Sequence, residues 1–122
     1  MKTNHVAQAE EYYTLVGEKN VEGIKKHLHS DVELYGPMAT LKGKEAVVQA
    51  TSNYMKVFNS LIIRAKFGAG EQAMIVYDVD IPGIREDFPG AVLLTFLDGL
   101  IIKIELFYDS NAFQEKKEET FS

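Results

Sequence analysis

The fold is indicated most directly by the stretch Ala73-Met74-Ile75-Val76-Tyr77-Asp78-Val79-Asp80-Ile81. It is dominated by β-branched and aromatic residues, which favour extended backbone. Successive side chains of a strand point to opposite faces, so the odd-numbered positions form one wholly apolar face. Asp78 and Asp80 share the other face with Met74 and Val76. The stretch is therefore expected to be a central strand with two chemically different sides.

The same period of two continues on both sides of this stretch. We expect one hairpin from residues 61–68 and 73–81, turning at Ala69-Gly70-Glu71, and a second from residues 91–97 and 100–108, turning at Asp98-Gly99.

The first half of the chain has helical spacing instead. Its apolar residues predict helices over residues 6–17, 20–28 and 44–58, with Asn20 as the N-cap of the second. Residues 31–35 alternate as a strand and end at Gly36-Pro37. The predicted order is α-α-β-α-β-β-β-β, an α+β fold with three N-terminal helices packed on a curved, mostly antiparallel sheet.

Length and composition limit the possibilities further. The 122 residues fit a single domain, residues 1–122, with a core of about 5–114 and a charged tail at 115–122. The absence of cysteine excludes disulfides and thiolate metal sites. A net charge of 13 − 18 = −5 disfavours nucleic-acid binding. No segment is apolar for long enough to be a signal peptide or membrane span, so we expect a soluble cytoplasmic protein without membrane partners.

Three segments together resemble the nuclear transport factor 2-like superfamily, in particular SnoaL-like and ketosteroid isomerase-like domains. They are residues 11–34, which include Asn20-Val21-Glu22-Gly23-Ile24, the helix entry Gly43-Lys44-Glu45-Ala46-Val47, and the ending at residues 98–109. The resemblance covers about residues 5–114. It implies a cystatin-like cone, in which the sheet wraps on the helices around an apolar pocket, and a homodimer.

The resemblance also allows two known catalytic arrangements to be tested. Ketosteroid isomerase-like enzymes use a helix-one tyrosine, an aspartate base after strand one and a protonated aspartic acid on a late strand. Tyr12 matches the tyrosine, but Gly36 and Val92 occupy the two acid positions. In limonene epoxide hydrolase-like enzymes an arginine stands between two aspartates. Asp80 matches one of these aspartates, whereas Asp78 replaces the arginine and Leu106 the second aspartate, so neither set is complete.

The orientation of Asp78 and Asp80 is left open by the sequence. If their face looks into the cone, which we favour, one carboxylate beside an apolar wall could act as a general base, and the apolar opposite face could form a dimer interface. If the apolar face lines the cone, both aspartates are solvated and take no part in chemistry.

Other polar residues offer weaker candidates. His27 and His29 are two residues apart, which is not the i, i+4 spacing of a helical metal site, so neither a metal nor a cofactor is expected. The segment between Gly83 and Gly90 joins the two hairpins, and Arg85 and Phe88 could reach a ligand from it.

Three functional interpretations follow. The first is a SnoaL-like domain that binds a small, mostly apolar or carbonyl-containing molecule. The second is an isomerase, cyclase or dehydratase that needs no cofactor, in which Asp80 or Asp78 removes a proton and Tyr12 stabilises the oxyanion. The third is a dimeric interaction module that uses the apolar face of the central strands. Besides Tyr12, the predicted pocket lining is Leu34, Met38, Tyr54, Met55, Phe58, Met74, Val76, Val92, Leu94, Phe96, Ile104, Leu106 and Tyr108.

Overall fold

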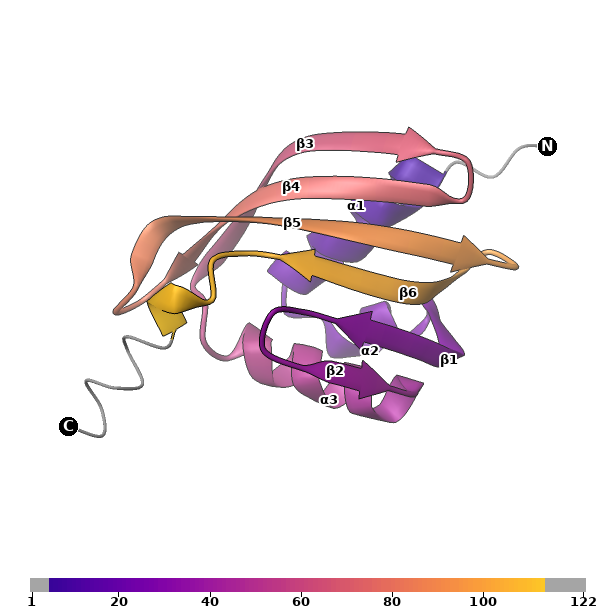
Figure 1. Cartoon of the computed structure of the whole chain (residues 1–122), viewed down its shortest axis with the longest axis horizontal. Coiled ribbons are helices and arrows are strands. Elements are labelled where there is room, and N and C mark those ends of the chain that lie inside the picture. The colour runs from indigo at the N-terminus through magenta and orange to yellow at the C-terminus, as the bar shows by residue number, and fades with distance from the viewer. Residues whose placement is uncertain (1–4, 114–122) are drawn as a thin grey trace.

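The computed structural model describes residues 5–113, so the predicted tail at 115–122 lies outside the described residues. Helices and a six-stranded sheet make up this part of the chain (Figure 1). The elements are α1 (His5–Gly17), α2 (Val21–Lys25), β1 (Leu28–Tyr35), β2 (Thr40–Lys42), α3 (Lys44–Met55), β3 (Ser60–Ala69), β4 (Gln72–Ile81), β5 (Arg85–Leu97) and β6 (Leu100–Phe107).

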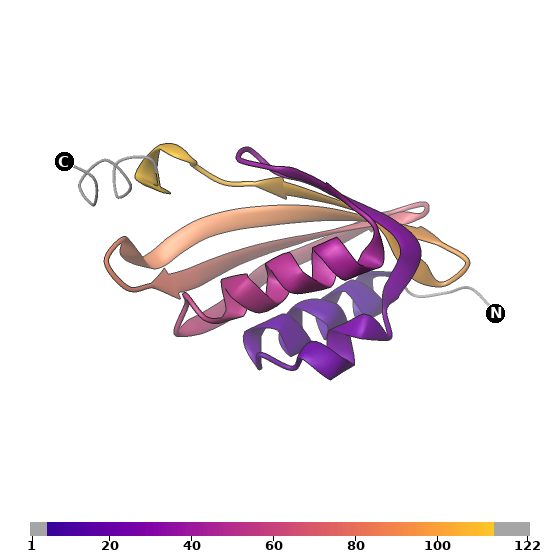
Figure 2. The same cartoon turned by 90° about the horizontal axis from the view of Figure 1, so that it is seen from below.

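The sheet has the strand order β2-β1-β6-β5-β4-β3. Its pairs are antiparallel except for β1 and β6, which run parallel. The three helices cover one face of the curved sheet (Figure 2). We call this covered side the inner face and the opposite side the outer face. The predicted α+β class, the curved and mostly antiparallel sheet, and the N-terminal helices are confirmed.

The helices form where the helical spacing predicted them, but two of them end earlier. The Asn20 side chain caps α2 by accepting a hydrogen bond from the Gly23 amide at 2.8 Å. This helix ends at Lys25, and Leu28 is already the first residue of β1. Likewise, α3 ends at Met55 instead of Phe58. In both places the apolar side chains continue into the core after the backbone has left the helix, so hydrophobic spacing alone overestimates the length of the helix.

Strand β2 was not predicted. It has three residues and pairs antiparallel with β1, and the turn between them is closed by a hydrogen bond of 2.9 Å from the Gly36 amide to the Ala39 carbonyl. The predicted turn at Asp98-Gly99 is confirmed, with φ values of 52° and 79°. Successive positive φ values are typical of tight hairpin turns.

Strand β5 is longer than expected because it begins at Arg85. The predicted loop from Gly83 to Gly90 is therefore mostly strand, and its residues pair with β4 up to the turn. Pairing up to the turn extends the sheet beyond the ends of the helices and positions Phe88 on the inner face, where it is 4% exposed.

Candidate functional site

A cavity of about 250 Å³ lies between the inner face of the sheet and helices α1 and α3. Every strand except β3 contributes to its wall, and the residues after β6 contribute as well. The lining consists of Tyr12, Tyr13, Val16, Leu34, Ala39, Leu41, Ala50, Thr51, Tyr54, Tyr77, Val79, Ile81, Phe88, Gly90, Ile104, Leu106, Tyr108 and Phe113.

The chemistry of this wall is apolar with a few hydroxyl groups. Among the described residues, no Asp, Glu, His, Lys or Arg lines the cavity. Its polar side chains are tyrosines and Thr51. A neutral molecule can therefore enter without leaving a buried charge unpaired, whereas an ion would lose its hydration and find no counter-charge in the wall.

Burial governs the tyrosines of the cavity. Removal from water raises the pKa of Tyr77 to about 12, and it raises the pKa values of Tyr12, Tyr13, Tyr54 and Tyr108 above their ordinary value as well. These hydroxyl groups consequently keep their protons across the physiological pH range. They are hydrogen-bond donors for a bound molecule, and none of them is ionised to act as a base.

Tyr12 is part of the cavity wall, as predicted. It is 2% exposed, its ring lies edge-on to Tyr13 with the centroids 5.6 Å apart, and its hydroxyl is in hydrogen-bonding contact with Thr51 of α3. The Thr51 hydroxyl in turn donates to the Val47 carbonyl at 2.8 Å. Tyr12 therefore joins α1 to α3 besides facing the cavity.

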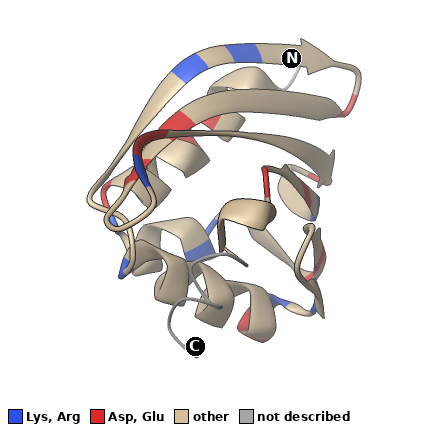
Figure 3. Ribbon diagram, turned by 60° about the vertical axis from the view of Figure 1, so that its left-hand side comes forward, with Lys and Arg blue, Asp and Glu red and all other residues tan. Residues whose placement is uncertain are grey.

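The expectation that Asp78 and Asp80 look into the cone is wrong. They alternate along β4 with Tyr77, Val79 and Ile81, which line the cavity, so the two carboxylates lie on the outer face. Acidic segments of the sheet are marked red in Figure 3.

The partners of the two aspartates also lie outside the cavity. Asp78 pairs with Arg64 at 3.3 Å, and Asp80 accepts a hydrogen bond from the Asn59 side chain at 3.2 Å. The physical reason is burial, because the helices cover whichever face of β4 is wholly apolar. The same face is thereby closed to a partner, which contradicts the interaction hypothesis in its original form.

Besides Tyr12, five of the predicted lining residues do line the cavity. They are Leu34, Tyr54, Ile104, Leu106 and Tyr108. Their contact with a ligand stays a prediction.

The remaining predicted residues lie elsewhere, and each displacement has a physical cause. Met55, Phe58, Val92, Leu94 and Phe96 are buried in the hydrophobic core and do not line the cavity, because neighbouring side chains fill the space around them. Met74 and Val76 share the outer face with the aspartates, because they have the same parity in β4. Met38 is 51% exposed in the β1–β2 turn.

Several lining residues were missed, and strand parity could have found those on β4. Tyr77, Val79 and Ile81 belong to the apolar face recognised in the sequence, which was expected to point away from the cone. Phe88 was named as a possible ligand contact and does line the cavity, where its ring packs edge-on against Phe113 at 5.3 Å. Arg85 is exposed and pairs with Asp87 at 2.7 Å instead.

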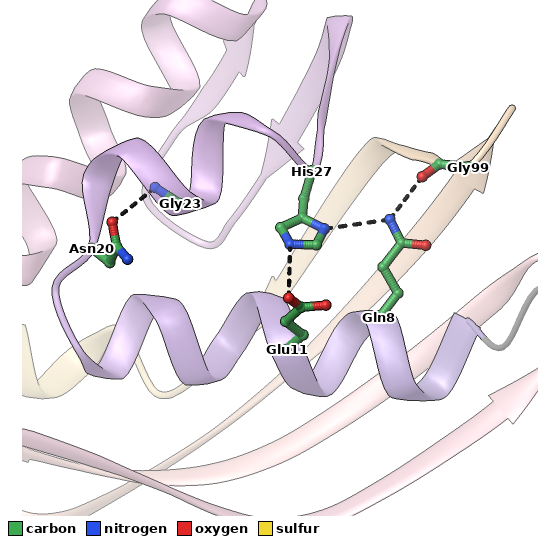
Figure 4. Close-up of polar contacts among 6 residues, drawn as sticks. All are labelled: Gln8, Glu11, Asn20, Gly23, His27 and Gly99. Atoms are coloured by element: carbon green, nitrogen blue, oxygen red, sulfur yellow. Dashed lines mark hydrogen bonds and ion pairs between the residues drawn. The ribbon is translucent and has the colours of Figure 1, made fainter.

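A polar cluster around His27 lies between α1 and the turn that joins β5 to β6 (Figure 4). The Gln8 side chain donates to the Gly99 carbonyl at 2.7 Å and lies 3.4 Å from Nδ1 of His27, whose Nε2 is 4.0 Å from Glu11. This cluster ties α1 to the β5–β6 turn. Within residues 5–113 no group of three or more His, Cys, Asp or Glu side chains could hold a metal ion, and no helix could span a membrane.

Residues 9–104 match the SnoaL-like domain family, so the chain belongs to that family. No curated protein matches it in sequence.

Similar solved structures extend the comparison. An NTF2-like protein of unknown function from Cytophaga hutchinsonii has a TM-score of 0.79 at 18% identity, covering 93% of this chain and 97% of its own. A Silicibacter pomeroyi protein with a cystatin-like fold has a TM-score of 0.78 at 19% identity, and the match covers 94% of this chain and 85% of that protein. A steroid delta-isomerase from Pseudomonas aeruginosa has a TM-score of 0.78 at 18% identity, and the match covers 99% of this chain and 93% of that protein. These likenesses confirm the predicted NTF2-like, cystatin-like fold and carry no activity over to this chain.

Proposed function

We propose that this protein binds a compact, neutral, mostly apolar small molecule in the cavity and does so without acid–base chemistry on it. The observation that carries the proposal is the composition of the wall, in which tyrosine and threonine hydroxyls are the polar side chains and no carboxylate, imidazole or amine occurs among the described lining residues. Ligand sites are typically apolar with a few fixed polar groups, and this wall fits that description.

The size of the cavity supports a small ligand. About 250 Å³ lies just below the range of roughly 300–1,000 Å³ found for drug-sized ligands. A molecule of one or two rings fits this space better than a larger polycyclic one. No observation favours the enzymatic alternative through Asp78 or Asp80, because both lie on the outer face and no carboxylate or imidazole is among the described residues that line the cavity with Tyr12.

Filling the cavity tests the proposal. Ala50 lines the cavity from α3, and we expect Ala50→Phe to weaken binding of a neutral probe such as 2-acetylnaphthalene. The new ring occupies space in which the probe would bury about one ring of its own, worth roughly 1.5–3 kcal/mol, or about 10- to 100-fold in Kd. Probe fluorescence in a titration measures this change.

The matched control is Gln49→Phe, which adds an aromatic ring to the exposed side of the same helix. It is expected to leave the Kd unchanged. Equal affinity in Ala50→Phe and the unmodified protein, or no measurable binding of any neutral aromatic probe to the unmodified protein, would contradict the proposed function.

We also propose that two copies associate through the outer face of the sheet. Its apolar side chains include Ile62, Phe67 and Phe107, which are 64%, 60% and 51% exposed. Charges of both signs flank them, with Arg64 and Asp78 on the β3 and β4 side and Lys103 with Glu105 on β6. A two-fold axis can therefore bring opposite charges of two copies together around an apolar centre.

A charge at the centre of this face tests the association. We expect Val76→Lys to convert a dimer of twice 13.7 kDa into a monomer in light scattering, since two lysines would meet near the axis. Gln49→Lys, on exposed α3, is expected to leave the mass unchanged. A monomeric unmodified protein at micromolar concentration, or a dimeric Val76→Lys variant, would contradict this proposal.

A further inference from the structure

The geometry points to Tyr77 as the residue that recognises the ligand, through a hydrogen bond from its hydroxyl to an acceptor oxygen such as that of a ketone, aldehyde or quinone. This inference rests on the proposed binding function and specifies the chemistry of the ligand. The sequence predicted that Tyr12 on α1 would donate a hydrogen bond to an oxygen of the ligand, and this inference assigns that role to Tyr77 on β4 instead.

The Tyr77 ring packs against two structural elements. It stacks on Tyr13 of α1, with ring centroids 5.3 Å apart and an angle of 26° between the planes. It also lies against Gly90, its partner in β5. A Cβ atom at this glycine would be 2.7 Å from Cζ and 2.8 Å from the hydroxyl oxygen of Tyr77. The absence of a side chain at residue 90 is what lets the ring lie against β5.

A ring fixed in this way presents its hydroxyl in one direction, which is the preorganisation that a specific donor needs. Tyr77 is 4% exposed, and it belongs to the cavity lining. Since the position is determined by a stacked neighbour and by backbone, the hydroxyl requires little rearrangement to meet a ligand.

Burial determines the protonation of Tyr77 and of its neighbour Tyr13. Removal from water is the main cause that raises the pKa of both tyrosines, so both hydroxyl groups keep their protons at physiological pH. Tyr77 can therefore donate its proton to an acceptor oxygen of the ligand.

The other tyrosines are less suited to this role. The Tyr12 hydroxyl is already in contact with Thr51. Tyr54 packs its ring on Phe58, with centroids 4.9 Å apart, and Tyr108 packs on Phe113 at 5.5 Å. Both are only half-buried, so water competes for their hydroxyl groups. Tyr77 combines deep burial with a ring that stacks on Tyr13 and lies against the backbone of Gly90.

The expected ligand is therefore a compact, neutral molecule with one carbonyl oxygen on an apolar body. Two probes of similar shape isolate this oxygen: 2-acetylnaphthalene, which carries a ketone, and 2-isopropylnaphthalene, which replaces it by a methyl group. We expect the unmodified protein to bind the ketone about tenfold more tightly, because a hydrogen bond to a buried donor contributes roughly that factor.

The decisive variant is Tyr77→Phe, which removes the hydroxyl and keeps the ring. It is expected to remove the tenfold preference for the ketone and to leave the Kd of the hydrocarbon unchanged. In infrared spectra, the carbonyl band of the bound ketone should lie at lower frequency in the unmodified protein and return to its apolar-solvent position in Tyr77→Phe. The matched control is Tyr35→Phe, which removes a hydroxyl that bonds Glu33 at 2.6 Å on the outer face.

The outcomes separate this inference from the proposed function. If both probes bind with equal affinity and Tyr77→Phe changes neither, the cavity binds apolar molecules and the role of Tyr77 is wrong. If the carbonyl band keeps its shift in Tyr77→Phe and loses it in Tyr54→Phe or Tyr108→Phe, the donor is a different tyrosine and the assignment is overturned. If neither probe binds the unmodified protein, the proposed function and this inference fail together.

Discussion

Replacement of Leu94 by alanine is expected to lower the free energy of unfolding by about 2–5 kcal/mol. The Leu94 side chain is 0% exposed on the inner face of β5, between partners Ala73 of β4 and Ile104 of β6. Truncation removes the burial of its methyl groups and leaves a void that fixed strands on both sides cannot close. Since small domains have roughly 5–15 kcal/mol of total stability, this one change is a large fraction of it.

The matched control lies three residues further along the same strand. Leu97 is 47% exposed, so Leu97→Ala is expected to change the free energy of unfolding by only about 0.5 kcal/mol. Urea denaturation followed by circular dichroism measures both. The comparison also distinguishes the core position of Leu94 from the lining position expected from the sequence. A residue that faced an existing cavity would have fewer neighbours to lose, and a cost below about 1 kcal/mol would contradict the placement in the core.

The fold could be predicted from the sequence because its signals are local. The side chain of Asn20 caps α2 through a hydrogen bond with Gly23, which is only three residues away in the sequence. The β5–β6 turn likewise needs only the two adjacent residues Asp98 and Gly99. Alternation and helical spacing also identify which side chains of each element share a face. Strand β2 carries no such signal, because three residues are too few to show a period and its pairing with β1 depends on the preceding turn.

The site was harder to predict because it depends on which face of β4 the helices cover. The parity of Asp78 and Asp80 was recognised, but parity alone does not say which face is inside. The positional match of Asp80 to a catalytic aspartate favoured the wrong choice. The continuous apolar character of the opposite face is the stronger physical signal, since an uninterrupted apolar face requires burial while two aspartates beside Arg64 and Asn59 do not.

The depth of the cavity along the cone could not be read from the sequence either. The side chains of Val92, Leu94 and Tyr77 all lie on the inner face of the sheet, but of these three only Tyr77 lines the cavity. The distinction depends on how closely α1 and α3 approach the sheet at each level. That distance is set by the summed volumes of side chains from several elements, a property of the packed structure that no single stretch of sequence contains.

Gly90→Val is expected to destabilise the protein by about 2–3 kcal/mol, although valine is the better strand residue. Strand preference favours valine over glycine by at most about 1 kcal/mol. Against this, a Cβ atom at residue 90 would lie 2.7 Å from Cζ of Tyr77, and the stacking of this ring on Tyr13 limits its freedom to move away. Overpacking of this kind typically costs about 1–3 kcal/mol and occasionally more, and a branched side chain adds further overlap.

The Tyr77→Ala background reveals the cause of this cost. Once the ring is absent, Gly90→Val meets free space and its strand preference prevails, so the double variant is expected to be more stable than Tyr77→Ala alone. The two changes should therefore couple by at least about 2–3 kcal/mol in a double-mutant cycle measured by urea denaturation. Equal destabilisation by Gly90→Val in both backgrounds would mean that the backbone of β5, and not the ring of Tyr77, requires glycine. In that case the ring would not be fixed by Gly90, and its hydroxyl would lose the rigid support on which recognition of a ligand oxygen depends.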